Sequence, residues 1–406
     1  MTVKNRILLT LWFLMLVNYL DRVAIGFAGP AIMRSLSMSP VAFGMILSAF
    51  SLGYLLAQLP GGLLADRFGA RTMLMLGPLL WALFTGLTGL VITTVAFILV
   101  RTCFGFSEGM SNTAIYKMIG EHFPADERSR AFAIFSTAIP LAPAFAGSLI
   151  GVLITELGWR EMFFLMTVPS CLAAVLIAFL VPKPSGPART TIAETRQERA
   201  GLGGLASSRA LWLLTGASLA WNLPYWGFLG WMPSYLAMQQ HIDLKAVGVA
   251  ASIPYGFAFL GMLVFGWLGS RVMRRHCVQL IVFCFLFAAL SLWMTYHAMT
   301  LAGAVAGLSG VAFFLFGTHG PIGKIVLDRA PAAARGAFVG IYTTGGQVGG
   351  LLAPVLIGWS VDVTKSFAAG IGLMIVGFVI AASCLLFLLR EDRIFRPVAT
   401  VGNGHD

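Results

Sequence analysis

GGLLADRFGAR, residues 61–71, is a charged turn sequence at the point where one long apolar run, residues 41–65, gives way to the next, residues 72–94. The paired glycines at its start allow two helices to approach closely. Asp66, Arg67 and Arg71 place charge where the chain reverses. A polar turn between two apolar runs that are each long enough to cross a bilayer predicts two adjacent transmembrane helices.

The composition of the whole chain favours the same class. Hydrophobic residues make up 58% of the 406 residues, charged residues make up 11%, and the mean hydropathy is +0.86. Soluble domains carry about 25% charged residues. The net charge of +11 does not indicate nucleic-acid binding, because the basic residues fall in short blocks between apolar runs. We therefore expect a multi-pass membrane protein in contact with lipid.

The chain contains twelve apolar runs, which predict an all-α membrane protein with twelve transmembrane helices in two six-helix bundles. The approximate runs are 7–32, 41–65, 72–94, 95–119, 130–154, 161–181, 210–237, 246–269, 277–297, 300–325, 335–360 and 366–389. A polar stretch rich in Pro and Gly divides them. The predicted domains are an N-terminal bundle (1–182), a cytoplasmic linker (183–208), a C-terminal bundle (209–392) and a cytoplasmic tail (393–406).

The distribution of Lys and Arg predicts the orientation of these helices. Loops on the side of the N-terminus hold nineteen basic residues, and loops on the opposite side hold four, which are Arg34, Arg160, Lys245 and Lys365. Cytoplasmic loops carry the excess of basic residues. The asymmetry predicts that both termini are cytoplasmic and that the protein lies in the cell inner membrane.

Four charged residues lie within apolar runs of the first half, and they are the strongest functional signal. Asp21 and Arg22 interrupt the first run, and Arg101 and Glu108 interrupt the fourth. A charge at the centre of a bilayer costs roughly 2.5–3.5 kcal/mol on insertion scales. Arg101 and Glu108 lie seven residues apart, which places them on one helix face about 10.5 Å apart. We expect these four side chains to bind and move a charged solute.

Chemistry suggests a role for each of the four. Arg22 is the expected receptor for a substrate carboxylate, because a guanidinium stays charged and binds carboxylates with two donors. Arg101 is the expected partner of Asp21 in the empty protein. Asp21 and Glu108 are the predicted proton-exchanging carboxylates, since burial and a shared arginine shift the pKa of a carboxylate in opposite directions. The alternative is that the four charges form ion pairs that only hold two helices together.

Other polar residues at membrane depth are candidates for the substrate cavity. Tyr54 and Gln58 lie one helical turn apart and share a face. The remaining candidates are Asn112, Asn222, Tyr225 and Trp226. Ordinary hydrogen bonding between helices is the alternative for each of them.

Several stretches resemble a known family. GGLLADRFGAR resembles the loop signature of the major facilitator superfamily, and NYLDR (18–22), RTCFGFSEG (101–109) and WMPSYL (231–236) resemble the anion:cation symporters within it. The resemblance implies the major facilitator fold, in which helices one, four, seven and ten line the cavity. It implies that Gly62, Asp66, Arg67 and Arg71 form a gating motif on the cytoplasmic side. It also implies that the positions of the four buried charges serve proton and anion binding.

Two segments depart from this family pattern. After Glu108 and Gly109, where relatives often have a proline-containing stretch, the chain has MSN (110–112). AIPLAPAFAGSLIG, residues 138–151, contains Pro140 and Pro143 in place of the usual Gly-rich form, and it resembles a helix-five signature of antiporters. Exchange of one solute for another therefore stays open as a mode of transport.

These observations predict a secondary active transporter that imports a small organic anion with protons. The expected substrates are a sugar acid, a hydroxy-dicarboxylate or an aromatic acid. We expect a monomer with no cofactor other than the proton as coupling ion, no metal site and no catalytic residues. The chain has no HExxH, no GxSxG with a plausible triad and no Walker A motif to support an enzyme or an ATP-driven pump. The alternatives are an antiporter or exporter of metabolites or drugs, and a nutrient sensor built on a transporter fold.

Overall fold

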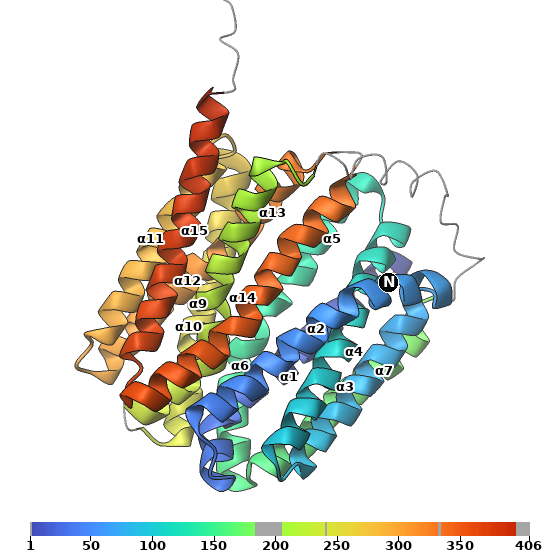
Figure 1. The fold of residues 1–406 in the computed structure, drawn as a ribbon. Coiled ribbons are helices and arrows are strands. Elements are labelled where there is room, and N and C mark those ends of the chain that lie inside the picture. The colour runs from blue at the N-terminus through green and yellow to red at the C-terminus, as the bar shows by residue number, and fades with distance from the viewer. Residues whose placement is uncertain (1, 183–204, 240–241, 332–333, 395–406) are drawn as a thin grey trace, which may run out of the picture.

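The computed structural model describes residues 2–182, 205–239, 242–331 and 334–394 of the chain (Figure 1). Every regular element in these residues is helical. The elements are α1 (Val3–Ser35), α2 (Pro40–Phe68), α3 (Ala70–Leu90), α4 (Thr94–His122), α5 (Ala125–Ser136), α6 (Ala138–Glu156), α7 (Trp159–Leu180), α9 (Arg209–Gln239), α10 (Leu244–Trp267), the π-helical turn η2 (Leu268–Val272), α11 (Cys277–Tyr296), α12 (Leu301–Gly317), α13 (His319–Arg329), α14 (Arg335–Thr364) and α15 (Ala368–Ile394). Each apolar run of the sequence forms a helix or a pair of helices. The predicted linker lies mostly outside the described residues.

Ten segments of the described chain are long and apolar enough to cross a membrane. α4 and α9 are not among them, although they contain 29 and 31 residues. Arg101 and Glu108 lower the hydropathy of α4, and α9 carries Asn222 and two prolines. Both helices that fall short therefore carry predicted site residues.

Two of the apolar runs are broken into shorter helices, and prolines explain both breaks. α5 ends at Ser136, four residues before Pro140, and α12 ends at Gly317, four residues before Pro321. Proline has no backbone N–H to donate to the carbonyl four residues earlier, so the helical ladder is interrupted there. The hydroxyl of Thr137 lies at the first break, where it accepts a 2.9 Å hydrogen bond from Trp12 Nε1.

The helices pack as two sets that meet along three helix pairs. In the first set α2 packs on α4, α3 packs on α4 and α7, and α1 packs on α6 and α7. In the second set α9 packs on α14 and α15, α10 packs on α12, and α11 packs on α12 and α15. The sets meet where α2 lies against α14, α6 against α10, and α1 against α9 (Figure 1).

A close contact between α2 and α4 positions the buried charges. A Cβ atom added to Gly53 would collide with the carbonyl oxygen of Thr102, and one added to Gly105 would collide with that of Phe50. Only glycine permits two helix backbones to approach this closely. The contact brings the α4 residues Arg101 and Glu108 against α2, beside α1.

Close backbone approaches between the two sets lie toward one end of the bundle. We call the end where α1 begins the terminal face, and the end where α1 finishes and α2 begins the far face. Toward the far face, Gly147 and Gly248 touch across the α6–α10 seam, and the amide of Ser148 donates a 3.1 Å hydrogen bond to Ser252 Oγ.

Candidate functional site

Arg22 and Glu108 form a buried ion pair between α1 and α4. The Glu108 side chain is 2% exposed and that of Arg22 is 11% exposed. Burying two charges carries a large desolvation cost, which a pair offsets only with good geometry and further contacts. Aromatic rings supply such contacts, because their faces attract a cation. The rings around the guanidinium belong to Tyr19, Phe50, Tyr54 and Trp226, at 4.4, 5.1, 5.8 and 5.6 Å.

Asp21 lies beside this pair but has a different partner. Ser170 Oγ, on α7, donates a 2.8 Å hydrogen bond to Asp21 Oδ2. Asp21 is 2% exposed, and its Oδ1 has no hydrogen-bond partner among the described residues. One oxygen of the Asp21 carboxylate therefore accepts a hydrogen bond inside the bundle, and the other has no partner in the described part of the chain.

The expected pairing of Arg101 with Asp21 is present as an electrostatic interaction between neighbouring charges, but not as a direct ion pair in the described part of the chain. Arg101 is 3% exposed and lies over the rings of Phe104, at 4.7 Å, and Phe50, at 5.7 Å. The ion pair joins Arg22 to Glu108 instead. Consecutive helix residues point about 100° apart, so Asp21 faces α7 while Arg22 faces α2, α4 and α9. Spacing along the chain could not predict this choice of partner.

A polar cavity of about 150 Å³ opens beside the ion pair. This volume has room for several water molecules. Asn112 Nδ2 donates a 2.6 Å hydrogen bond to the hydroxyl oxygen of Tyr54 at its wall. The polar lining residues are Asn18, Tyr19, Arg22, Tyr54, Glu108, Ser111, Asn112, Tyr116 and Ser136. The cavity thus combines one ion pair with several neutral hydrogen-bonding groups.

The predicted lining residues are only partly brought together. Tyr54 and Asn112 line the cavity with Arg22 and Glu108. Gln58 is half-buried and does not line it. The side-chain amide of Asn222 donates to the carbonyl of Ser218 on its own helix, at 2.8 Å.

Tyr225 and Trp226 bring the second set of helices to the site. The hydroxyl of Tyr225, on α9, lies 3.4 Å from that of Tyr19, on α1. Trp226 packs against Phe50 with ring centroids 5.6 Å apart and contacts Arg22. Both predicted residues therefore meet first-half residues at the junction of the two sets.

A second, smaller cavity of about 20 Å³ separates the two arginines. Arg22, Arg101 and Trp226 line it. Arg22 Nε, Arg101 Nε and Trp226 Nε1 have no hydrogen-bond partner in the described part of the chain. All three atoms are donors. The arrangement is therefore suited to an anionic oxygen.

Sequence reasoning missed three residues of the site. Tyr19 lies within NYLDR, three residues before Arg22, so helical spacing could have indicated it. Ser111 follows Glu108 by the same interval. Ser170 is an isolated hydroxyl in an apolar run, and no local signal connects it to Asp21.

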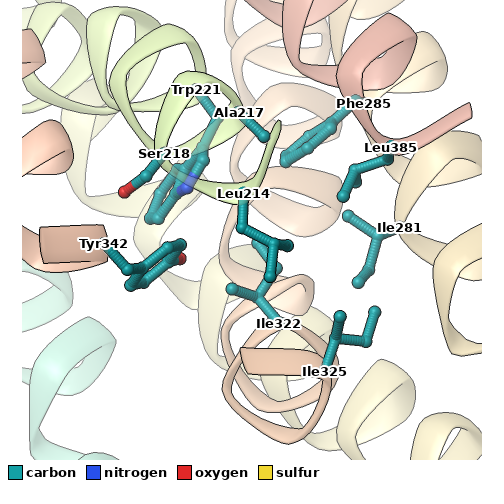
Figure 2. A pocket seen from close by; sticks show the side chains of 10 residues that line it. All are labelled: Leu214, Ala217, Ser218, Trp221, Ile281, Phe285, Ile322, Ile325, Tyr342 and Leu385. Atoms are coloured by element: carbon teal, nitrogen blue, oxygen red, sulfur yellow. The ribbon is translucent and has the colours of Figure 1, made fainter. Parts of the chain in front are cut away.

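Another pocket lies wholly in the second set of helices and is apolar. Figure 2 shows that Leu214, Ile281, Ile322 and Ile325 project into it, with Ser218 and Tyr342 at one side. Its volume of about 10 Å³ barely admits one water molecule. This pocket is a packing defect of the core and does not fit a solute.

The predicted gating motif has a clear local role within the first set. Gly69, with φ of 82°, is the single residue between α2 and α3, and this φ favours glycine. Arg71 donates from Nε to Val181 O at 2.9 Å and from Nη2 to Ala178 O at 2.7 Å, which satisfies free carbonyls at the end of α7. Arg67 is exposed and lies over the ring of Phe68. The Asp66 side chain and the surroundings of Gly62 lie outside what the structure describes.

The structure is a helical bundle with membrane-spanning segments and a buried ion pair. A cavity suited to an anion lies between its two sets of helices. These features are typical of a solute transporter. The chain belongs to the Major Facilitator Superfamily, whose family model matches residues 11–354. The protein is accordingly a transporter and not an enzyme.

Proteins of known sequence and structure support this assignment. The chain is 28% identical to the "Hexuronate transporter" of Bacillus subtilis (strain 168), over 98% of this chain and 97% of the relative. It is 31% identical to the "Probable L-galactonate transporter" of Escherichia coli (strain K12), over 96% and 90%. The crystal structure of a D-xylose-proton symporter matches with a TM-score of 0.77 and 16% identity, over 95% of this chain and 97% of that one. The structural likeness shows the fold alone.

Proposed function

We propose that this protein imports a small organic anion together with protons across the cell inner membrane. The Arg22–Glu108 ion pair at the wall of the polar cavity carries the proposal. A buried arginine held by an internal carboxylate is a site that a substrate carboxylate can take over, because guanidinium binds either carboxylate with the same geometry.

Proton coupling follows from the competition for Arg22. When a substrate carboxylate occupies Arg22, Glu108 loses its partner at 2% exposure. An unpaired buried charge is so unfavourable that the group neutralises instead. Glu108 therefore takes up a proton as the anion binds and releases it as the anion leaves. Asp21, with Oδ1 unpartnered, is the second proton site in this scheme.

The cavity favours an acid that carries hydroxyl groups. Asn18, Tyr54, Ser111 and Asn112 supply both donors and acceptors along its wall. Relatives named for hexuronate and L-galactonate transport agree with this chemistry. Among the three expected classes of substrate, we therefore place a sugar acid ahead of a hydroxy-dicarboxylate or an aromatic acid.

Alternating access fits the way the two sets of helices meet. We propose twelve transmembrane segments, counting α4 and α9, in two six-helix bundles over 1–182 and 209–392. Both termini are cytoplasmic in this proposal, so the far face is external, and the protein works as a monomer. The contacts at Gly147 and Gly248 then close the external side of the described state. The gating motif, which includes Asp66, would close the cytoplasmic side in the opposite state.

Purified protein in liposomes tests the proposal. Uptake of radiolabelled D-galacturonate is measured with an inward proton gradient and without one. We expect the gradient to drive accumulation in the wild type and not in Glu108→Gln, while Glu156→Gln, at the exposed end of α6, behaves as the wild type. Gradient-driven accumulation by Glu108→Gln at the wild-type level would refute the coupling scheme. Uptake that needs an internal anion would instead identify an exchanger.

A further inference from the structure

A surface cavity of about 870 Å³ lies at the far face, across the seam between the two sets of helices. Met33 and Arg34, at the end of α1, line it on one side. Met238 and Lys245 line it on the other. We call this cavity the seam vestibule. Pro40, which also lines it, touches Gly358 across the closed α2–α14 contact.

The vestibule holds two basic residues, although it lies on the face of the protein that carries the fewest basic residues. Of the four basic residues predicted for the external side, Arg34 and Lys245 both line this cavity. The other two have local partners, since Arg160 donates to Val91 O at 3.1 Å and Lys365 pairs with Asp362 at 3.2 Å. Arg34 and Lys245 are exposed and pair with no acidic residue in the described part of the chain.

Local structural needs do not account for Lys245. It lies in the first turn of α10, where the helix dipole disfavours a cation. The one acidic residue that lines the vestibule is Asp243, and its Oδ1 accepts a 2.8 Å hydrogen bond from the amide of Ala246, which caps the same helix. Arg34 lies at the end of α1, where the dipole favours it. The residues that line the vestibule thus carry a net positive charge beside the seam.

We propose that the seam vestibule is an external capture site that gathers anionic solute before the far face opens. The inference rests on the proposed orientation and substrate class. Arg34 and Arg22 lie on the same helix, twelve residues or about 18 Å apart, so α1 connects the vestibule to the buried site. A recessed surface with a positive balance of charge raises the local concentration of anions and their rate of arrival.

The first experiment measures the charge of the vestibule without any transport. Met238→Cys, at a side chain that is 41% exposed, is labelled on whole cells with methanethiosulfonate ethylsulfonate, an anion, or methanethiosulfonate ethyltrimethylammonium, a cation. The chain without this substitution corrects for native cysteines. We expect Arg34→Gln with Lys245→Gln to lower the anion-to-cation ratio of labelling rates by about fivefold at low salt. The change should nearly vanish at about 1 M salt. An unchanged ratio, or no labelling from outside, overturns the proposal.

The second experiment measures capture. D-galacturonate uptake into cells at low ionic strength should show KM raised about threefold or more in the double variant, with the maximal rate unchanged. Lys365→Gln, on the same face but away from the vestibule, is the matched control. An unchanged KM together with a lowered labelling ratio overturns capture while leaving the proposed function intact. A wild type that carries no acid defeats the proposed function, and the labelling ratio still decides whether the vestibule attracts anions.

Discussion

The indole ring of Trp226, on α9, lies 5.6 Å from the guanidinium carbon of Arg22, on α1. One half of the molecule thus places an aromatic face and an unpartnered N–H beside the central cation of the other half. Movement of the two halves relative to each other would change the surroundings of that cation. Substrate binding and the conformational change are therefore linked at this contact in the proposed mechanism.

Two substitutions of Trp226 separate its donor from its ring. Trp226→Phe removes the indole N–H, which has no hydrogen-bond partner among the described residues. We expect roughly tenfold weaker binding of D-galacturonate, since a hydrogen bond to a charged group contributes about 1.5–3 kcal/mol. Trp226→Ala also removes the ring over Arg22 and should weaken binding further. Isothermal titration of purified protein measures both. Wild-type affinity in Trp226→Phe would exclude the indole N–H as a ligand of the anion.

The Arg22–Glu108 pair predicts a stability pattern as well as a transport defect. Arg22→Ala leaves a buried carboxylate without a partner, which costs about 3–5 kcal/mol when one member of a buried pair is removed. Adding Glu108→Gln removes that charge, so the double variant should recover most of the lost thermal stability. It should still fail to transport. Thermal unfolding in detergent gives the first result and liposome uptake the second; a double variant no more stable than Arg22→Ala would contradict the pair.

Ser170 is expected to act as a positioning residue through Asp21. Ser170→Ala removes the 2.8 Å hydrogen bond to Asp21 Oδ2 from a buried carboxylate whose Oδ1 has no hydrogen-bond partner among the described residues. The expected loss of stability is about 1–3 kcal/mol. Ser360→Ala is the control, because that hydroxyl donates only to Ile357 O of its own helix, at 2.8 Å. If the dependence of uptake on external pH is the same in Ser170→Ala as in the wild type, Ser170 has no role in proton coupling.

Closure of the far face depends on a glycine contact. Gly248→Ala would place a Cβ against the carbonyl oxygen of Gly147, so we expect the variant to disfavour the closed external side and to transport at less than about a tenth of the wild-type rate. The folded protein should persist, because alanine is the better helix former. Gly256→Ala, on the same helix with open space around it, should transport normally. Labelling of Ser252→Cys from outside should rise in Gly248→Ala and not in Gly256→Ala.

Arg71 should contribute to stability through the end of α7. Arg71→Ala loses both hydrogen bonds to the carbonyls of Ala178 and Val181, and we expect destabilisation of about 1–3 kcal/mol. Arg67→Ala should leave the melting temperature unchanged, since Arg67 is exposed and its guanidinium lies over the ring of the neighbouring Phe68. Equal melting temperatures for the two variants would show that Arg71 has no structural role.

The sequence alone determined the helices and the importance of the buried charges. Apolar runs long enough to cross a bilayer predict helices whatever their neighbours are, because lipid forces the backbone to satisfy its own hydrogen bonds. Asp21, Arg22, Arg101 and Glu108 stand out for the same reason, since charge in an apolar run is costly. The helix breaks before Pro140 and Pro321 were also readable in principle, from the missing N–H of proline.

Only the tertiary structure decided which charges meet. Asp21 and Arg22 are neighbours in the chain, but they point about 100° apart and reach different helices. Ser170 binds Asp21 and Glu108 binds Arg22 because α7 and α4 pack on different sides of α1 and because Gly53 and Gly105 let α4 approach α2. Trp226 reaches Arg22 only because α9 of the second half lies against α1. Partners more than 80 residues apart depend on packing, and no local pattern in the chain specifies them.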